Sequence, residues 1–329
     1  MGMVRTAAAL AAGLIGLLAI APPGASAQAY PARPITLVMP YPPGGGTDFI
    51  GRMLGQGLER RLGQPVVLEY RPGAGSAIAA TYVSRQPGDG YTILYATSTT
   101  MAINVSVHKK LNYDPVKDLM PIGMLAVSPF ILVVNPSLPI KSVADIAAIA
   151  KSKPGTLSYA SNGPGGAAHL FAELMKSMLG IELTHVPYKG NAPALNDVVA
   201  GHVSLMFVDP SAAVQLAKQG KLTALGITTA QRAPMAPDVP PLAEVGLPGF
   251  DVASWHMLVA PAATPQVILA RLNTELRAVV TDPKVTEEMT KRGFVPRTAG
   301  TPEELAGFVK SEIVRWGQVV QRAGAAGIQ

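Results

Sequence analysis

The sequence contains no cysteine, and this absence excludes several kinds of site. No disulfide can form, no thiolate can bind a metal ion, and no cysteine can act as a nucleophile. An exported chain that carries a lipid anchor has a cysteine at its cleavage site. We therefore expect the mature protein to be soluble rather than tethered by a lipid.

Other catalytic and metal-binding patterns are also missing. The five histidines form neither a His-x-x-x-His nor a His-Glu-x-x-His pair, which argues against a metal site on a helix. There is no Gly-x-Ser-x-Gly nucleophile elbow, no dinucleotide fingerprint, and no loop ending in Gly-Lys-Ser or Gly-Lys-Thr. We therefore expect a protein that is not an enzyme and that uses neither a cofactor nor a metal ion.

Strong charge is missing as well. The formal net charge is +6, and the basic residues are scattered rather than arranged in a stripe with aromatic residues between them. Nucleic acid is therefore not an expected partner. A mild positive field does suit small anionic ligands.

The first residues read as a targeting segment. Arg5 provides a positive charge, residues 6–21 are apolar and small, and Ala25-Ser26-Ala27 fits the cleavage rule for signal peptides. The alternative is a membrane anchor, but the apolar run of 16 residues is shorter than the ~20 that span a bilayer. We predict cleavage after Ala27 and export to the periplasm by the Sec route.

After this segment, short apolar strands alternate with amphipathic helices. The first series has strands at 35–39, 66–70 and 91–96 and helices at 46–62 and 77–84. The second has strands at 130–134, 157–160, 184–188, 203–207 and 222–228 and helices at 143–151, 167–179, 192–200 and 214–219. This order predicts two α/β units, with a parallel sheet and helices on both of its faces.

The end of the chain follows a different pattern. A strand at 254–260 precedes a helix from about 264 to 280. Thr301-Pro302-Glu303-Glu304 is a capping box with proline at the first helical position, so it predicts the start of a last helix. We expect Trp316 to anchor this helix in the core.

Three glycine-rich loops, at 40–48, 71–76 and 161–166, each follow a predicted strand and precede a helix. Glycine lets the backbone approach a ligand closely, and the unpaired N–H groups at a helix start attract anions. Ligands of open α/β sheets lie at the carboxyl ends of strands, where these loops are expected. The loops therefore predict an anion site, although tight turns alone would also explain the glycines.

Polar side chains accompany these loops. Thr47 lies in the first loop, and Ser161 and Asn162 lie in the third. Ser98 and Thr99 belong to a fourth loop, at 97–100, where four hydroxyl residues either donate to a carboxylate or cap a helix.

Three titratable residues are further candidates. His169 either reaches a ligand from the start of its helix or packs in the interior. Asp48 is either a general base or a brace for the first loop. Asp209 follows the strand at 203–207 and can bind a hydroxyl or amine group of a ligand.

Several segments occur together in a recognisable order. They are 30–35, 40–48, 71–75, 86–91, 185–190, 247–250 and 301–304. In these segments the sequence resembles the solute-binding receptors of tripartite tricarboxylate transporters, often called Bug proteins, from Tyr30 to about Gln318. Where family members often have serine or threonine after the third loop, this chain has Ala167 and Ala168.

The resemblance implies a periplasmic-binding-protein fold with two Rossmann-like α/β lobes, a ligand cleft, and chain crossovers between the lobes. The expected domains are 28–129 with 252–329, and 130–251. The implied partners are a small carboxylate and the membrane subunits of the transporter, bound by a monomer. The candidate ligand-binding residues are Tyr41, Pro43, Gly44, Gly45, Gly46, Thr47, Asp48, Ser98, Thr99, Ser161, Asn162, Gly165, Gly166, His169 and Asp209.

Two other functions remain open from the sequence. A periplasmic sensor that signals to a kinase would use the same cleft. A secreted hydrolase would use Asp48 or His169 as its base.

Overall fold

The computed structural model describes residues 30–188, 190–297 and 300–328. The predicted signal segment and its cleavage position therefore lie outside the described residues. Contacts divide the chain into a short unit, Met1–Ala32, and a compact unit, Arg33–Gln329.

The first sheet has the strand order β11-β4-β10-β3-β1-β2. Its strands are β1 (Ile35–Met39), β2 (Val66–Tyr70), β3 (Thr92–Thr97), β4 (Leu119–Ser128), β10 (Ser254–Pro261) and β11 (Val295–Pro296). Strand β1 pairs in parallel with β2 and β3. Strand β10 lies between β3 and β4 and is antiparallel to both.

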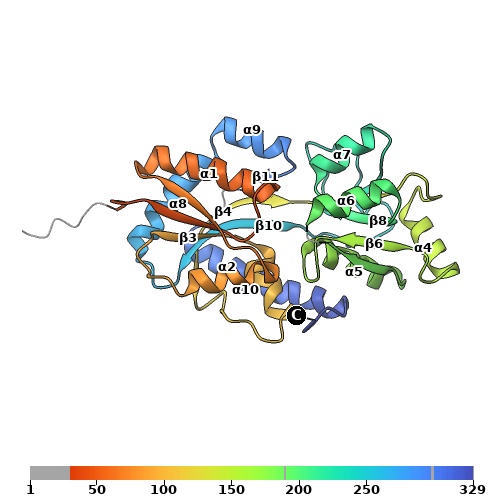
Figure 1. Ribbon diagram of the computed structural model, residues 1–329, viewed down its shortest axis with the longest axis horizontal. Helices are drawn as coiled ribbons and strands as arrows, with labels where there is room; N and C mark the ends of the chain where they lie inside the picture. Colours follow the sequence, from red (N-terminus) through yellow and green to blue (C-terminus); the bar gives the residue numbers. More distant parts are fainter. Residues whose placement is uncertain (1–29, 189, 298–299, 329) are drawn as a thin grey trace, which may run out of the picture. The chain divides into compact units, whose positions relative to one another are not determined.

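Helices cover both faces of this sheet (Figure 1). Helices α1 (Gly46–Leu62), α8 (Gln266–Val280) and α9 (Pro283–Lys291) lie on one face, and α2 (Ala77–Ser84) and α10 (Pro302–Arg322) lie on the other. The π-helical turn η2 (Thr99–Ile103) and the short helix α3 (Asn104–Val107) follow β3. The apolar face of α1, with Ile50, Leu54 and Leu58, is buried, as helical spacing predicts.

The second sheet has the order β7-β6-β8-β5-β9. Its strands are β5 (Ile131–Val134), β6 (Ser158–Ser161), β7 (Thr184–Pro187), β8 (Leu205–Val208) and β9 (Thr223–Ile227). Its helices are α4 (Val143–Ser152), α5 (Ala167–Leu179), α6 (Asn191–Ala200) and α7 (Pro210–Lys218). Strand β6 is parallel to β7 and β8, whereas β5 is antiparallel to β8 and β9.

Both sheets are therefore mixed, and the prediction of parallel sheets was wrong for the pairings of β10 and β11 in the first sheet and of β5 in the second. The reason lies in the connections. Strand β5 enters the second sheet directly from β4, and β10 returns to the first sheet from the opposite direction. Neither β5 nor β10 follows a crossover helix, which is the unit that makes neighbouring strands parallel. The two-residue strand β11 pairs only with β4, at the edge of the first sheet. The two-lobed α/β architecture itself is confirmed.

The chain crosses between the lobes at two adjacent places. Only two residues separate Ser128, at the end of β4, from Ile131, at the start of β5. The return runs from β9 to β10, and Thr228 Oγ1 accepts a hydrogen bond of 2.9 Å from the backbone N–H of Phe130, between the two crossings. The division into 28–129 with 252–329, and 130–251, remains our proposal for the domain boundaries.

Helix ends confirm the capping signals. Thr301 Oγ1 accepts from the N–H of Glu304 at 3.3 Å, and the Thr301 N–H donates to Glu304 Oε2 at 2.8 Å. Trp316 is buried, as predicted. The sequence did not predict β4, α3, α9 or β11, and α7 begins at Pro210 rather than at residue 214.

Candidate functional site

The registers of the two sheets place the predicted loops at edges that face each other. His256, near the start of β10, pairs with Thr97 at the end of β3, and Ser254 pairs with Ser128 at the end of β4. The chain crosses to the other lobe directly after Ser128. The carboxyl ends of β1 and β3, with the loops that follow them, therefore lie on the crossing side of the first lobe.

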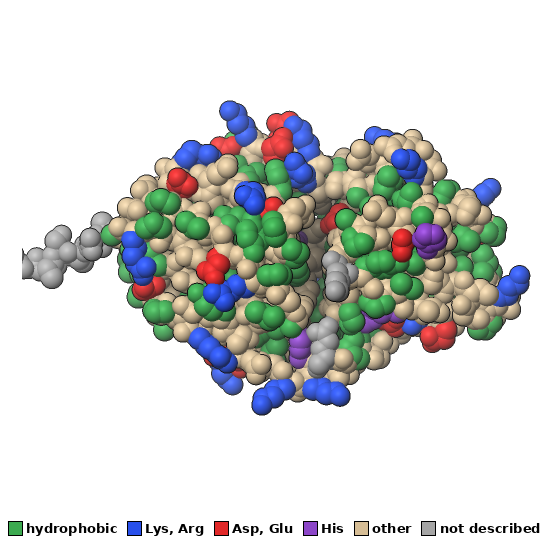
Figure 2. Space-filling view, viewed as in Figure 1, with side chains coloured by type: hydrophobic (Ala, Val, Ile, Leu, Met, Phe, Trp, Pro, Cys, Tyr) green, Lys and Arg blue, Asp and Glu red, His purple; other side chains and the backbone are tan. Residues whose placement is uncertain are grey.

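The same holds in the second lobe. Ile131, the first residue of β5, pairs with Val208 at the end of β8 and with Ile227 at the end of β9. Because β6 is parallel to β8, its last residue, Ser161, lies at this edge too. The loop at 161–166 and Asp209 therefore lie on the crossing side of the second lobe. Figure 2 shows the surface hollowed between the two lobes.

The first glycine loop leads into α1 without a side-chain cap. Gly45 is the N-cap, and the first backbone bond of the helix runs from Phe49 N–H to the Gly45 carbonyl at 3.1 Å. The N–H groups of Gly46 and Thr47 precede that bond and have no acceptor within the described part of the chain. Gly44 has a φ of +94°, a conformation that favours glycine.

Asp48 braces this loop. Its Oδ2 accepts from the Gly44 N–H at 2.9 Å, and its Oδ1 accepts from Arg52 Nε at 3.0 Å and from the Tyr70 hydroxyl. Burial acts to raise the pKa of Asp48, but the hydrogen bonds from Tyr70, Gly44 and Arg52 outweigh it and lower the pKa below its usual value. Both oxygens are engaged, which favours the bracing role over that of a general base.

Tyr41 of the first loop belongs to a group of hydroxyl side chains that contact one another. The Tyr41 hydroxyl lies 3.1 Å from Thr97 Oγ1, and Thr100 Oγ1 lies 2.8 Å from Ser76 Oγ and accepts from the Thr97 N–H at 3.2 Å. Burial raises the pKa of Tyr41 despite these hydroxyl neighbours, so its hydroxyl stays protonated and can donate.

Ser98 makes a different contact. Its Oγ lies 3.0 Å from Ser254 Oγ, which ties the end of β3 to the start of β10. Thr99 begins the π-helical turn and is buried. Ser98 and Thr99 therefore lie at the edge of the first sheet from which the chain crosses to the other lobe.

Two histidines brace the third loop. Ser161 Oγ lies 2.7 Å from His185 Nε2 and accepts from the Gly163 N–H at 3.1 Å. The Gly165 N–H donates to His169 Nδ1 at 3.1 Å. His169 is buried, which favours the packing role over contact with a ligand. Its bond to the Gly165 N–H also holds the third loop in place.

The two histidine rings belong to an aromatic stack. The His169 and His185 ring centroids are 4.4 Å apart, and His185 lies 4.7 Å from the Tyr159 ring. Burial lowers the pKa of His169, and burial together with the neighbouring His169 lowers the pKa of His185 to about 4. Both rings are therefore neutral near pH 7, and the third loop rests on an uncharged support.

Helix α5 starts as α1 does. Gly166 is its N-cap without a side-chain bond, and its first backbone bond runs from Leu170 N–H to the Gly166 carbonyl at 3.0 Å. Nearby, Asn162 Oδ1 is buried and has no partner among the residues that the structure describes. Each lobe thus presents a helix start to the crossing side, an arrangement that binds anions.

Asp209 accepts a hydrogen bond of 3.0 Å from Asn191 Nδ2, at the start of α6. Burial raises the pKa of Asp209, although the Asn191 bond opposes the shift. The Asn191 Oδ1 atom is buried without a partner in the described residues. This pair adds polar groups to the second lobe's edge of the site.

Three residues at the first lobe's edge carry no signal of a site in the sequence. Tyr95 and His256 are joined by a 3.1 Å hydrogen bond between the tyrosine hydroxyl and Nδ1, and the Phe294 ring lies edge-on to His256 at 5.2 Å. His256 stood within a predicted strand, so its place in the sequence carried no sign of a polar role. Phe294 follows α9, which was not predicted.

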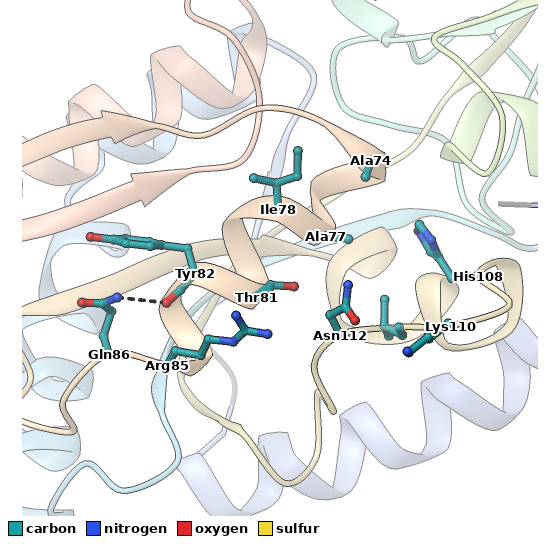
Figure 3. A pocket seen from close by; sticks show the side chains of 11 residues that line it. Ala74, Ala77, Ile78, Thr81, Tyr82, Arg85, Gln86, His108, Lys110 and Asn112 are labelled. Atoms are coloured by element: carbon teal, nitrogen blue, oxygen red, sulfur yellow. Dashed lines mark hydrogen bonds between the residues drawn. The ribbon is translucent and has the colours of Figure 1, made fainter.

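A separate cavity of about 460 Å³ lies elsewhere on the first lobe, between α2 and the loop after α3 (Figure 3). Ile78, Arg85, His108 and Lys110 are among its lining residues. None of the candidate ligand-binding residues lines this cavity, so it is distinct from the predicted site.

The described residues hold no group of three or more histidine or acidic side chains that could bind a metal ion. Within that same part of the chain, no helix is long and apolar enough to span a membrane.

Comparison with known proteins identifies relatives of this chain. A family described as "Tripartite tricarboxylate transporter family receptor" matches residues 50–325, which agrees with the resemblance found in the sequence. The structure of Rpa4515 from R. palustris with adipate has a TM-score of 0.84 to this chain, with 38% identity, and covers 90% of this chain and 99% of its own.

Two further solved structures are similar over comparable lengths. The periplasmic binding protein BugD has a TM-score of 0.81 and 34% identity, covering 90% of this chain and 99% of its own. MatC from Rhodopseudomonas palustris with bound malate has a TM-score of 0.80 and 34% identity, covering 88% of this chain and 100% of its own.

Proposed function

The chain belongs to the tripartite tricarboxylate transporter receptor family, and from this premise we propose that it captures a small carboxylate in the periplasm and delivers it to the membrane subunits of such a transporter. A receptor of this family is a binding protein rather than an enzyme. The two similar structures with ligands contain adipate and malate, and both ligands are dicarboxylates.

One observation carries the proposal: a helix start faces the crossing side in each lobe. The N–H groups of Gly46 and Thr47 lead into α1, and those of Ala167 and Ala168 lead into α5, without side-chain caps. Such groups stabilise an anion through hydrogen bonds and the helix dipole. One helix start per lobe suits a ligand with two carboxylates, each held by one lobe.

The charges of the loops agree with a dicarboxylate. Neither the loop at 40–48 nor that at 161–166 contains lysine or arginine. Asp48 has both of its oxygens engaged in the protein, so it braces the loop without facing the ligand. The polar candidates Tyr41, Ser98 and Asn162 then form hydrogen bonds with the rest of the ligand.

Closure follows from a ligand that contacts both lobes. A ligand stabilises the closed state only by the contacts that it makes there and lacks in the open state. The crossings at 128–131 and 228–254 are the segments that would flex. Closure presents a new combined surface of both lobes to the transporter, which distinguishes the loaded receptor from the empty one.

Titration calorimetry tests the proposal directly. The purified protein is titrated with adipate, malate, citrate and benzoate, and adipamide serves as the matched neutral control. We expect a dicarboxylate to bind, adipamide not to bind, and X-ray scattering to show a smaller radius of gyration with ligand. Failure of every mono-, di- and tricarboxylate to bind would contradict the proposal.

A further inference from the structure

His256 occupies a position at the crossing edge of the first lobe that no sequence motif marks. It pairs with Thr97 on one side and with Ala126 on the other, near the start of β10. Directly opposed residues on neighbouring strands point to the same face of a sheet. The His256 side chain therefore lies beside that of Thr97, whose Oγ1 contacts the hydroxyl of Tyr41 in the first glycine loop.

Phe294 connects His256 to the start of α1. The Phe294 ring packs edge-on against the imidazole, with 5.2 Å between centroids. The same ring lies close to Gly46, because a Cβ atom at Gly46 would lie 3.2 Å from Phe294 Cζ. Phe294 therefore packs near both His256 and the helix start that the proposed function assigns to a carboxylate.

The imidazole of His256 is neutral. The residue is only 5% exposed, and burial lowers the pKa of His256 to about 3. Burial also raises the pKa of Tyr95 well above its usual value, so the tyrosine keeps its proton. Two neutral groups therefore share the 3.1 Å hydrogen bond between the Tyr95 hydroxyl and His256 Nδ1.

The tautomer of His256 follows from the number of buried polar atoms that each tautomer leaves without a partner. If Nδ1–H donated to Tyr95, the buried tyrosine O–H would lack an acceptor, and Nε2 would lack a donor. If the Tyr95 O–H donates to Nδ1, the Nε2–H is the one group of this pair without a hydrogen-bond partner. Because buried unsatisfied groups are costly, the second arrangement is favoured, and Nε2 carries the proton.

That Nε2 atom is buried and has no hydrogen-bond partner among the described residues. Resting on the proposed function, we propose that the Nε2–H of His256 donates a hydrogen bond to an oxygen atom of the bound carboxylate ligand, and that His256 is thereby a specificity-determining residue of the first lobe. The acceptor is a carboxylate, hydroxyl or carbonyl oxygen.

A neutral, fixed donor selects by chemistry rather than by charge. It accepts an oxygen at its position and disfavours an ammonium group, which has no lone pair to offer. An alkyl group there would leave the Nε2–H unsatisfied, so such a ligand binds less well. His256 thus complements the helix start. The helix start favours any anion, whereas the His256 N–H favours a ligand with an oxygen atom at one position.

Calorimetry on His256→Phe tests the proposal with adipate and malate as probes. Phenylalanine keeps a ring against Phe294 and removes both nitrogens. We expect about tenfold weaker binding of the better probe, the effect of one lost hydrogen bond. His108→Phe is the matched control, because His108 also has a buried, unpartnered Nε2 but lines the separate cavity, and its binding should equal that of the wild type.

Nitrogen NMR of the wild-type imidazoles gives a second readout that does not depend on a variant's folding. We expect His256 to show the Nε2–H tautomer without ligand, and its Nε2–H proton to shift and become protected from exchange when the probe binds. Tyr95→Phe should release the tautomer preference.

The outcomes separate the two claims. A wild type that binds a probe while His256→Phe binds it equally well overturns this inference alone, as does an Nδ1–H tautomer or a signal that the probe leaves unchanged. A wild type that binds no carboxylate overturns the proposed function and this inference with it.

Discussion

Trp255 and Trp316 donate their indole N–H groups to the same atom, Glu312 Oε2, at 2.7 and 3.0 Å. Trp255 belongs to β10 and Trp316 to α10, so the shared carboxylate joins the central strand of the first lobe to its last helix. The Trp316 ring also stacks on Phe171 of α5, with centroids 6.0 Å apart. One buried acidic residue therefore supports a contact between the lobes.

Glu312→Ala should destabilise the protein by about 2–4 kcal/mol, because two buried indole N–H groups lose their acceptor together. Glu312→Gln keeps an acceptor oxygen and should cost less. The chain has only these two tryptophans, so urea unfolding followed by tryptophan fluorescence reports on this site. Equal unfolding free energies for wild type and Glu312→Ala would show that Glu312 is not the shared acceptor of the two indole N–H groups.

Gly44 and Gly45 form a matched pair for testing the first loop. Neither would bring a new Cβ within 4 Å of another atom, but Gly44 has a φ of +94° and Gly45 a φ of −91°. Gly44→Ala should therefore cost about 1–2 kcal/mol of unfolding free energy, and Gly45→Ala much less. Thermal unfolding of both variants measures the difference, and equal losses would show that the conformation of Gly44 is not required.

Asp48→Asn should destabilise the fold at neutral pH by about 1–2 kcal/mol, because the bonds from Gly44, Arg52 and Tyr70 favour the charged form. The pKa of Asp48 is lowered in the folded protein, so this stabilisation is present above the unfolded pKa and is lost as the pH falls through the folded pKa. Urea unfolding at pH 7 and near pH 3 should show a difference that shrinks in acid.

Glu287→Gln is the control for Asp48→Asn. Glu287 makes an exposed ion pair of 2.7 Å with Lys291, and exposed pairs contribute little. No measurable change is expected at either pH. If Glu287→Gln lost as much unfolding free energy as Asp48→Asn, the loss would not be specific to the contacts of Asp48.

His185 should make stability fall in mild acid. Burial and the neighbouring His169 lower its pKa from 6.5 to about 4. Between these values the unfolded chain binds more protons than the folded one, so stability declines as the pH drops from 6.5 towards 4, by up to about 3 kcal/mol from this group. His185→Gln should flatten the decline seen by urea unfolding at pH 7, 5.5 and 4.5, leaving the contributions of the other buried histidines, among them His169 and His256.

An unchanged slope in His185→Gln would mean that His185 does not stay neutral in the folded protein. The affinity of His185→Gln for adipate or malate tests the role of His185 in supporting the third loop. Because Ser161 Oγ lies 2.7 Å from His185 Nε2, we expect loss of the third loop's support to weaken binding as well.

Local sequence signals predicted the helices better than the sheets. The ends of α1, α2 and α5 follow from helical spacing and from the glycines around them, and all three agree with the structure. The partners of β10 could not be predicted in this way, because β3 and β4 lie more than 120 residues earlier in the chain. Pairing over such separations depends on the whole fold, which no short pattern records.

The candidate site shows the same division. Glycine loops and hydroxyl residues were visible as local clusters, and the structure places them at the facing edges of the lobes. Their supports were not visible, because Tyr70, His185 and Ser254 come from other strands. His256 was missed for a related reason: one polar residue in a buried strand is unremarkable until its unpartnered nitrogen is seen.

The position of β10 has a consequence for the order in which the protein can assemble. The second sheet is built from one continuous stretch, 131–227, and can form while synthesis continues. The first sheet stays divided, with β3, β1 and β2 on one side and β4 on the other, until residues 254–261 leave the ribosome. Domains usually fold in the order of their synthesis, but here the lobe that is begun first is finished last.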